Sequence, residues 1–240
     1  MNKRISVLSV PIDCVTMDEA VQRILQLTDE PGLHLVATAN AEMVMLANEN
    51  PTLHTILNDA SLVVPDGAGI LWAAERQGEH VPERVTGVDV TKRLFKVAAE
   101  RQIPVYCLGA APGVAQRAID NLSAQVGPLN IAGIHDGFFD STEEQEIVKA
   151  ISESKAKLVF VALGVPKQEQ WISEKLSHLD GVVAIGIGGS FDVLAGNIPR
   201  APEWMQRNRL EWLYRLYLEP QRIGRMLAIP KFMWTVIRNK

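Results

Sequence analysis

Cysteine is scarce in this sequence: Cys14 and Cys107 are the two cysteines among 240 residues. Two cysteines cannot form the disulfide framework of a small secreted protein, so a reducing compartment is expected. Long apolar runs are also missing, because no stretch approaches the roughly 18 apolar residues that cross a bilayer. The N-terminus lacks the apolar core and the small-residue cleavage site of a signal peptide. We therefore expect a cytoplasmic protein, peripheral on the inner face of any membrane it meets.

Motifs of common enzyme classes are missing too. The sequence has no G-x-S-x-G elbow and no Walker motif, which leaves hydrolase and P-loop hypotheses unsupported. The glycine-rich turn at 109–113 could cradle a diphosphate, but Ala111 and Val114 break the G-x-G-x-x-G pattern of dinucleotide sites. A nicotinamide oxidoreductase is therefore a weak alternative, and a tight strand-to-helix turn explains the glycines equally well. The five histidines have no metal-ligand spacing, so neither a metal nor a cofactor is predicted.

What the sequence does have is a regular alternation of short apolar runs and amphipathic segments. Apolar residues make up 47% of the chain and charged residues 22%, which suits a globular protein with a sizeable core. The runs predict strands at 5–10, 33–37, 62–64, 105–108, 130–134, 158–162 and 182–187. Helical periodicity lies between them, near 17–27, 41–48, 69–77, 89–101, 113–126, 142–154 and 167–177. This alternation predicts an α/β fold whose mostly parallel, Rossmann-like sheet is covered by helices on both faces.

The alternation stops after the last predicted strand. Gly188-Gly189 and the turn-rich stretch at 196–202 indicate a boundary, and helical patterns follow at 203–218 and 220–237. Pro220 suits the first position of the second of these helices. We expect residues 1–195 to form the α/β body and residues 196–240 to form a C-terminal helical appendage.

Charge divides the chain at nearly the same place. Residues 200–240 hold nine Lys or Arg and three Asp or Glu, a net of +6, which leaves −10 for residues 1–199 of a chain whose total is −4. Three of the five tryptophans also lie in this segment, at 204, 212 and 234. A basic, aromatic segment is typical of contact with an anionic membrane surface. A solvated basic helix that packs on its own domain is the alternative.

Within the appendage, Arg215, Arg222 and Arg225 are spaced by seven and three residues. On a continuous helix they would share one face. Guanidinium groups recognise phosphate oxygens well, so this face is a candidate for binding a diphosphate. A solvated basic stripe is the more ordinary explanation of the same spacing.

Polar residues follow several predicted strands, where ligands bind in parallel α/β sheets. Thr38 and Asn40 end one strand, and Asp66 ends the next between Pro65 and Gly67. A carboxylate at an open strand end suits a general base. From local sequence alone, an Asp that caps the next helix or closes a turn is the favoured interpretation.

Taken together, these segments resemble the WecG/TagA/CpsF glycosyltransferase family. The resemblance rests on the order and spacing of short motifs across most of the chain: Thr38-Ala-Asn40, Pro65-Asp66-Gly67-Ala-Gly69, Arg84 with Thr86-Gly87, Gly164-Val-Pro-Lys-Gln168-Glu-Gln-Trp171, Gly188-Gly189-Ser-Phe-Asp192 and Arg200-Ala-Pro202. It implies that Asp66 is the catalytic base. It also implies that Thr38, Asn40, Arg84 and Gln168 line the substrate pocket, and that a basic appendage carrying Arg215, Arg222 and Arg225 closes over it.

The resemblance further implies an inverting transfer of N-acetylmannosamine from UDP to undecaprenyl-diphosphate-linked N-acetylglucosamine at the cytoplasmic face and without a metal. This transfer is the committed step of wall teichoic acid linkage-unit synthesis. The implied partners are UDP-N-acetylmannosamine, the undecaprenyl-diphosphate-GlcNAc acceptor and an anionic membrane surface, with no nucleic acid. Self-association is expected if the appendage is displaced. N-acetylmannosaminuronic acid as the donor sugar, and a nucleotide-binding peripheral membrane protein without turnover, remain alternatives.

Overall fold

The computed structural model describes residues 3–208, 210–218, 220 and 223–239. Its strands are β1 (Arg4–Val7), β2 (Val10–Asp13), β3 (Leu33–Ala39), β4 (Leu62–Pro65), β5 (Val105–Gly109), β6 (Ile131–His135), β7 (Leu158–Ala162) and β8 (Val182–Gly186). The helices that accompany the strands are α1 (Met17–Leu27), α2 (Ala41–Glu49), α3 (Pro51–Asp59), α4 (Ala68–Arg76), α5 (Gly87–Arg101), α6 (Val114–Val126), α7 (Ser141–Glu153), α8 (Lys167–Lys175) and α9 (Ser190–Leu194). The C-terminal helices are α10 (Glu203–Arg207), α11 (Glu211–Leu218), α12 (Ile223–Met226) and α13 (Ala228–Arg238).

Six strands form one parallel sheet in the order β4-β3-β8-β7-β5-β6. The predicted α/β class is therefore confirmed. The first predicted strand is different, because residues 5–10 contribute to two short strands that pair with each other and not with the main sheet. Leu8 and Ser9 both have positive φ angles, which turns the chain back on itself between β1 and β2.

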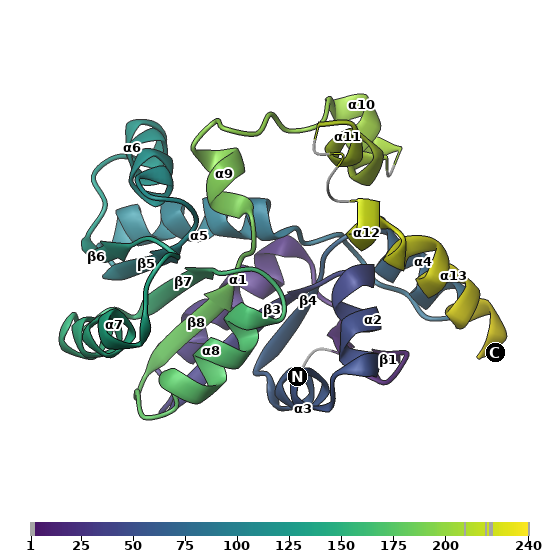
Figure 1. Cartoon of the computed structure of the whole chain (residues 1–240), viewed down its shortest axis with the longest axis horizontal. Helices are drawn as coiled ribbons and strands as arrows, with labels where there is room; N and C mark the ends of the chain where they lie inside the picture. The colour runs from purple at the N-terminus through teal and green to yellow at the C-terminus, as the bar shows by residue number, and fades with distance from the viewer. Residues whose placement is uncertain (1–2, 209, 219, 221–222, 240) are drawn as a thin grey trace.

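Helices cover both faces of the sheet, as Figure 1 shows. Alternate residues of each central strand point to opposite faces, so Val159 and Val161 of β7 join one apolar cluster while Leu158 and Phe160 join the other. One cluster contains α2, α3 and α8, and the other contains α1, α5 and α6. Burial on both sides explains why β7 and β8 are apolar at nearly every position.

Capping residues begin several of the helices. Helix α1 begins with a capping box, in which Thr16 accepts a hydrogen bond from the Glu19 backbone and Glu19 accepts one from the Thr16 backbone. Helix α3 was not predicted, although Asn50 caps it and Pro51 occupies its first position. Asn50 also ends α2, so two short helices meet there, and helical periodicity alone does not separate them clearly.

The C-terminal segment folds into four described helices instead of the two predicted ones. Helix α13 packs against α2 and α4, where its Phe232 is fully buried and Val236 nearly so. Helices α10 and α11 stand away from the sheet, at the end of an extended connection from α9 (Figure 1). No helix in the described part of the chain combines the length and the apolar character needed to cross a membrane.

Candidate active site

A cavity of about 420 Å³ lies beyond the carboxyl ends of β3, β4, β7 and β8. This is the edge at which parallel α/β sheets bind their ligands. It is lined by residues from the strand ends, from the helices that follow them and from the C-terminal segment: Thr38, Asn40, Ala41, Glu42, Asp66, Gly67, Ala68, Gly69, Trp72, Arg84, Thr86, Gly87, Val88, Gly164, Val165, Gln168, Ile187, Gly188, Gly189, Ser190, Glu211, Trp212, Ile229 and Met233. The five body residues proposed from sequence, Thr38, Asn40, Asp66, Arg84 and Gln168, all line this cavity.

Asp66 follows directly on β4, and its backbone N–H donates to the carbonyl of Ala39 at 2.8 Å. Its Oδ2 accepts a hydrogen bond from the backbone N–H of Gly87, the first residue of α5, at 3.1 Å. Asp66 does not cap the helix that follows it, because the N-cap of α4 is Gly67 and has no side-chain cap bond. The carboxylate therefore lies in the cavity and at the N-terminus of α5, where a helix stabilises negative charge.

Gly87 brings the α5 N-terminus close to the sheet. A Cβ at this position would lie 3.2 Å from Ser190 Oγ and 3.5 Å from Thr38 Oγ1. A side chain there would crowd the Ser190 hydroxyl at the start of α9, whereas its distance from Thr38 is an ordinary van der Waals contact. The glycine therefore eases the packing of the α5 N-terminus, whose N–H binds Asp66, against Ser190.

Thr38 and Asn40 have structural bonds as well as a place in the cavity wall. Thr38 Oγ1 donates to the carbonyl of Gly186 at 3.1 Å, which links β3 to β8 at their carboxyl ends. Asn40 caps α2, with Oδ1 accepting from the Met43 N–H at 3.0 Å. Among the described residues the Asn40 amide nitrogen has no partner, so its two hydrogens can serve a ligand.

Gln168 is almost fully buried, and both ends of its amide bind the protein. Its Oε1 accepts from the Gly188 N–H at 3.0 Å, and its Nε2 donates to Glu169 Oε1 at 2.7 Å. The side chain therefore forms the wall of the cavity and holds the loop after β8.

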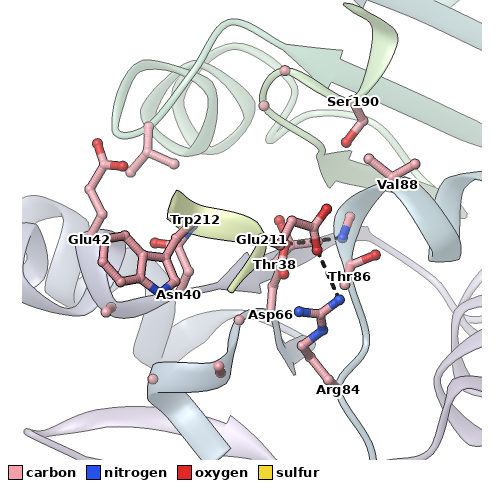
Figure 2. Close-up of a pocket in the computed structure, with 18 of the residues that line it drawn as sticks. Thr38, Asn40, Glu42, Asp66, Arg84, Thr86, Val88, Ser190, Glu211 and Trp212 are labelled. Atoms are coloured by element: carbon pink, nitrogen blue, oxygen red, sulfur yellow. Dashed lines mark hydrogen bonds and ion pairs between the residues drawn. The ribbon is translucent and has the colours of Figure 1, made fainter. Parts of the chain in front are cut away.

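Arg84 is paired with a residue of the C-terminal segment. Its Nη2 donates to Glu211 Oε2 at 2.9 Å, and Figure 2 shows the two side chains pointing toward one another beside Asp66. Arg200 Nε lies 3.8 Å from the other oxygen of Glu211. The carboxylate of Glu211 is thus placed between two guanidinium groups, and this connects α11 to the cavity wall.

Arg200 also makes a bidentate ion pair with Asp89, in which Nη1 and Nη2 donate to the two carboxylate oxygens at 2.5 and 2.6 Å. Burial acts to raise the pKa of Asp89, but the hydrogen bonds from Arg200 and Thr86 outweigh it and hold that pKa below its usual range. The same pairing raises the pKa of Arg200. Thr86 Oγ1 accepts from the Asp89 N–H and caps α5, so the ion pair is fixed to the helix that also binds Asp66.

The three tail arginines proposed from sequence cannot be placed in this geometry. Arg222 lies outside the described residues, and so do the side chains of Arg215 in α11 and Arg225 in α12. Other residues of the same segment do reach the cavity: Glu211 and Trp212 from α11, and Ile229 and Met233 from α13.

Sequence reasoning missed Glu211, the paired cationic group Arg200 and the cavity residue Ser190 as site residues. Arg200 and Ser190 belong to motifs on which the family resemblance rests, so the sequence could have indicated them as site residues. Glu211 is indicated less clearly, as one of three acidic residues in a basic segment. Within the described ranges, no three His, Cys, Asp or Glu side chains come together as metal ligands would.

The sequence profile of the WecG/TagA/CpsF glycosyl transferase family matches residues 5–240 of this chain. The chain belongs to that family. It is therefore a glycosyltransferase of this family, and the cavity at the sheet edge is its candidate active site.

Two of the proteins similar to this chain match it over most of its length. A Bacillus subtilis (strain 168) protein is 35% identical over 206 residues, which cover 86% of this chain and 80% of that protein. A Staphylococcus aureus (strain NCTC 8325 / PS 47) protein is 31% identical over 239 residues, covering 99% and 93%. Both are named N-acetylglucosaminyldiphosphoundecaprenol N-acetyl-beta-D-mannosaminyltransferase.

Proposed function

We propose that this glycosyltransferase moves N-acetylmannosamine from UDP-N-acetylmannosamine to N-acetylglucosamine carried on undecaprenyl diphosphate, with inversion at the anomeric carbon. The observation that carries the proposal is the Asp66 carboxylate, held by the Gly87 N–H in a cavity whose wall also contains Arg84. The names of the similar proteins support this donor and acceptor. In this role the enzyme would act early in wall teichoic acid assembly.

Asp66 is the general base of the proposed reaction. The acceptor 4-hydroxyl gives its proton to the carboxylate as its oxygen forms a bond to the anomeric carbon of the donor. The bond between that carbon and the UDP oxygen breaks, and the electron pair leaves with UDP. Because attack and departure occur on opposite faces of the sugar, one displacement inverts the anomeric centre.

Arg84 is the described cation best placed to act on the departing diphosphate. It lines the cavity, and its side chain is only 19% exposed, so its charge is poorly screened by water. A guanidinium near a growing negative charge stabilises the transition state most when water is excluded. Arg215, Arg222 and Arg225 are proposed to add to this charge when the tail covers the cavity.

The tail, residues 196–240, is proposed to attach the enzyme to an anionic membrane surface, because the polyprenyl acceptor is confined to the bilayer. Helix α13 buries Phe232 against the body but exposes Trp234 to 59% and Ile237 to 50%. Trp204 and Tyr217 in α10 and α11 are exposed to 60% and 80%. Exposed aromatic rings on a segment of net charge +6 suit the headgroup region.

The substrate assignment is tested by a donor screen. The full chain is incubated with a short-chain GlcNAc-diphosphate lipid and either UDP-N-acetylmannosamine or UDP-N-acetylmannosaminuronic acid, and the product is identified by mass spectrometry. We expect transfer of N-acetylmannosamine. Transfer of the uronic acid alone would replace the donor, and UDP release that does not depend on the acceptor would contradict the transferase proposal.

The membrane proposal is tested by co-sedimentation with anionic and neutral vesicles across a salt series. The double variant Trp204→Ser, Trp234→Ser is expected to bind anionic vesicles more weakly than the unchanged chain. Phe138→Ser is the matched control, since Phe138 is 73% exposed but lies in the body. Equal loss of binding in the control, or no preference for anionic lipid, would place attachment elsewhere.

A further inference from the structure

Glu169 on α8 is a buried carboxyl group that the proposed chemistry does not use. It is 0% exposed, although it is the third residue of its helix and follows two polar neighbours. Burial raises its pKa from the ordinary value of 4.5 to about 7. A buried carboxyl group is costly unless it is bonded, so its bonds indicate what it does.

The two oxygens of Glu169 differ in their surroundings. Oε1 accepts a hydrogen bond from Gln168 Nε2 at 2.7 Å, whereas Oε2 is buried and has no partner among the described residues. A group retained only for stability would not leave one oxygen unsatisfied, because an apolar side chain of similar size avoids that cost. The bond to Gln168 is therefore the feature to explain.

The strand beside this pair has no room for a side chain. A Cβ at Gly186 would lie 2.6 Å from Gln168 Nε2 and 2.8 Å from Glu169 Oε1, which is closer than real contacts allow. The amide and the carboxyl group thus pack directly against the backbone at the end of β8. Since Thr38 donates to the carbonyl of the same glycine, the pair is fixed at the cavity edge of the sheet.

The other end of the Gln168 amide controls the cavity loop. Gln168 Oε1 accepts from the N–H of Gly188, which has a φ of +52° and lines the cavity with Gly189. If the amide turned over, its NH₂ would face the Gly188 N–H and its oxygen would face Glu169 Oε1. Glu169 and Gly188 together therefore determine one orientation of the amide.

We infer that Glu169 is a positioning residue for the transfer reaction: it accepts from Gln168 Nε2, so that Gln168 Oε1 holds the Gly188 N–H and shapes the loop that lines the substrate cavity. This role rests on the proposed function, because the loop must contact a substrate for its position to affect the rate. Small displacements of substrate-positioning groups change rates by up to about a hundredfold.

Two variants of the full chain separate positioning from packing. Glu169→Gln keeps an oxygen that can accept from Gln168, whereas Glu169→Met has similar length and no oxygen. Hydrogen exchange of the Gly188 amide reports the orientation of Gln168 without any substrate. Melting temperature and kcat/KM for sugar transfer are measured on the same samples.

For Glu169→Met we expect the Gly188 amide to exchange at least about tenfold faster and kcat/KM to fall by about tenfold to a hundredfold. The melting temperature should stay the same or rise, because the unpaired oxygen is removed. Glu169→Gln should restore slow exchange and most of the activity. A change of activity opposite in sign to the change in stability cannot come from packing alone.

Ile172→Val is the matched control, since Ile172 is fully buried on the same helix and does not contact the cavity. It should lower the melting temperature and leave Gly188 exchange unchanged. Unchanged Gly188 exchange in Glu169→Met would overturn the inference. If Gly188 responds as expected but the unchanged chain transfers no sugar, the proposed function fails, and the link from Glu169 to the loop stands.

Discussion

The body and the C-terminal tail differ in how far their large apolar side chains are buried. In the body the central strands are fully buried, and Phe138 is the one large apolar side chain that the structure shows as exposed. In the tail the exposed side chains include Trp204, Tyr217, Leu227 and Trp234. Net charge follows the same division, with −10 in residues 1–199 and +6 in residues 200–240. The body thus buries nearly all of its large apolar side chains, whereas the tail leaves several exposed, and these are the side chains proposed to contact a membrane.

The two regions meet at the cavity. Thr38, Asp66 and Gln168 of the body line one part of its wall, and Glu211 and Trp212 of the tail line another. The carboxylate proposed as the base belongs to the body, and the tail contributes another part of the cavity wall, so the two regions are expected to contribute differently to the reaction. This separation predicts that damage to each region changes activity in a different way.

The largest expected effect is removal of the tail after residue 195. The body should remain folded and lose nearly all activity, because Glu211, Trp212 and the other tail residues that line the cavity are gone. It should also self-associate, since the surface that covers Phe232 becomes exposed. Circular dichroism, size-exclusion chromatography with light scattering, and the transfer assay measure these outcomes. A monomeric, fully active truncated chain would show that the tail is not part of the active site.

Asp66→Asn should lower kcat by about 10²–10⁴-fold, the usual cost of losing a general base. Asn keeps an oxygen that can accept from the Gly87 N–H, so folding and UDP binding should be nearly unchanged. Single-turnover transfer and UDP binding by calorimetry are the measurements. Asp120→Asn, on the outer surface of α6, is the matched control and should behave like the unchanged chain. Near-normal turnover by Asp66→Asn would exclude it as the base.

The next effect concerns stability and belongs to the body alone. Glu169 has a pKa of about 7 when folded and about 4.5 when unfolded, so the folded protein binds its proton more tightly. The stability this provides is full below pH 4.5 and is lost as pH rises through 7. At about 1.4 kcal/mol per pKa unit, the loss is on the order of 3 kcal/mol. The free energy of unfolding, measured with urea, should fall by about that amount across this pH range for the unchanged chain and not for Glu169→Gln. The same pH dependence in both proteins would contradict the prediction.

The smallest expected effect tests the junction between the two regions. Glu211→Gln weakens the ion pair with Arg84, so the tail should leave the cavity more often and kcat/KM should fall by about fivefold or less. Glu203→Gln is the control, because Glu203 pairs with Arg207 on the tail surface and not with the body. A rise in kcat/KM for Glu211→Gln would instead mean that Glu211 competes with the substrate diphosphate for Arg84.

Features that depend on neighbouring residues could be predicted from the sequence. The capping box at Thr16 and Glu19, the buried strand at 158–162 and the two-face cover of the sheet follow from local periodicity and caps. The grouping of Thr38, Asn40 and Asp66 at one sheet edge also follows, because parallel strands bring their carboxyl ends together. The β1–β2 hairpin was missed because its turn uses Leu8 and Ser9 at positive φ, where no glycine marks it.

The sequence by itself determined the fold class, the division of charge and the residues at the strand ends. Tertiary structure decided what each of these residues contacts. It placed the Gly87 N–H against Asp66, Glu211 between Arg84 and Arg200, and Glu169 in a buried site beside Gln168. Arg84 and Glu211 are 127 residues apart, and no local propensity specifies such a pair. Only the packing of strands and helices removes water from these groups and fixes their partners, and that is what makes the cavity a candidate active site.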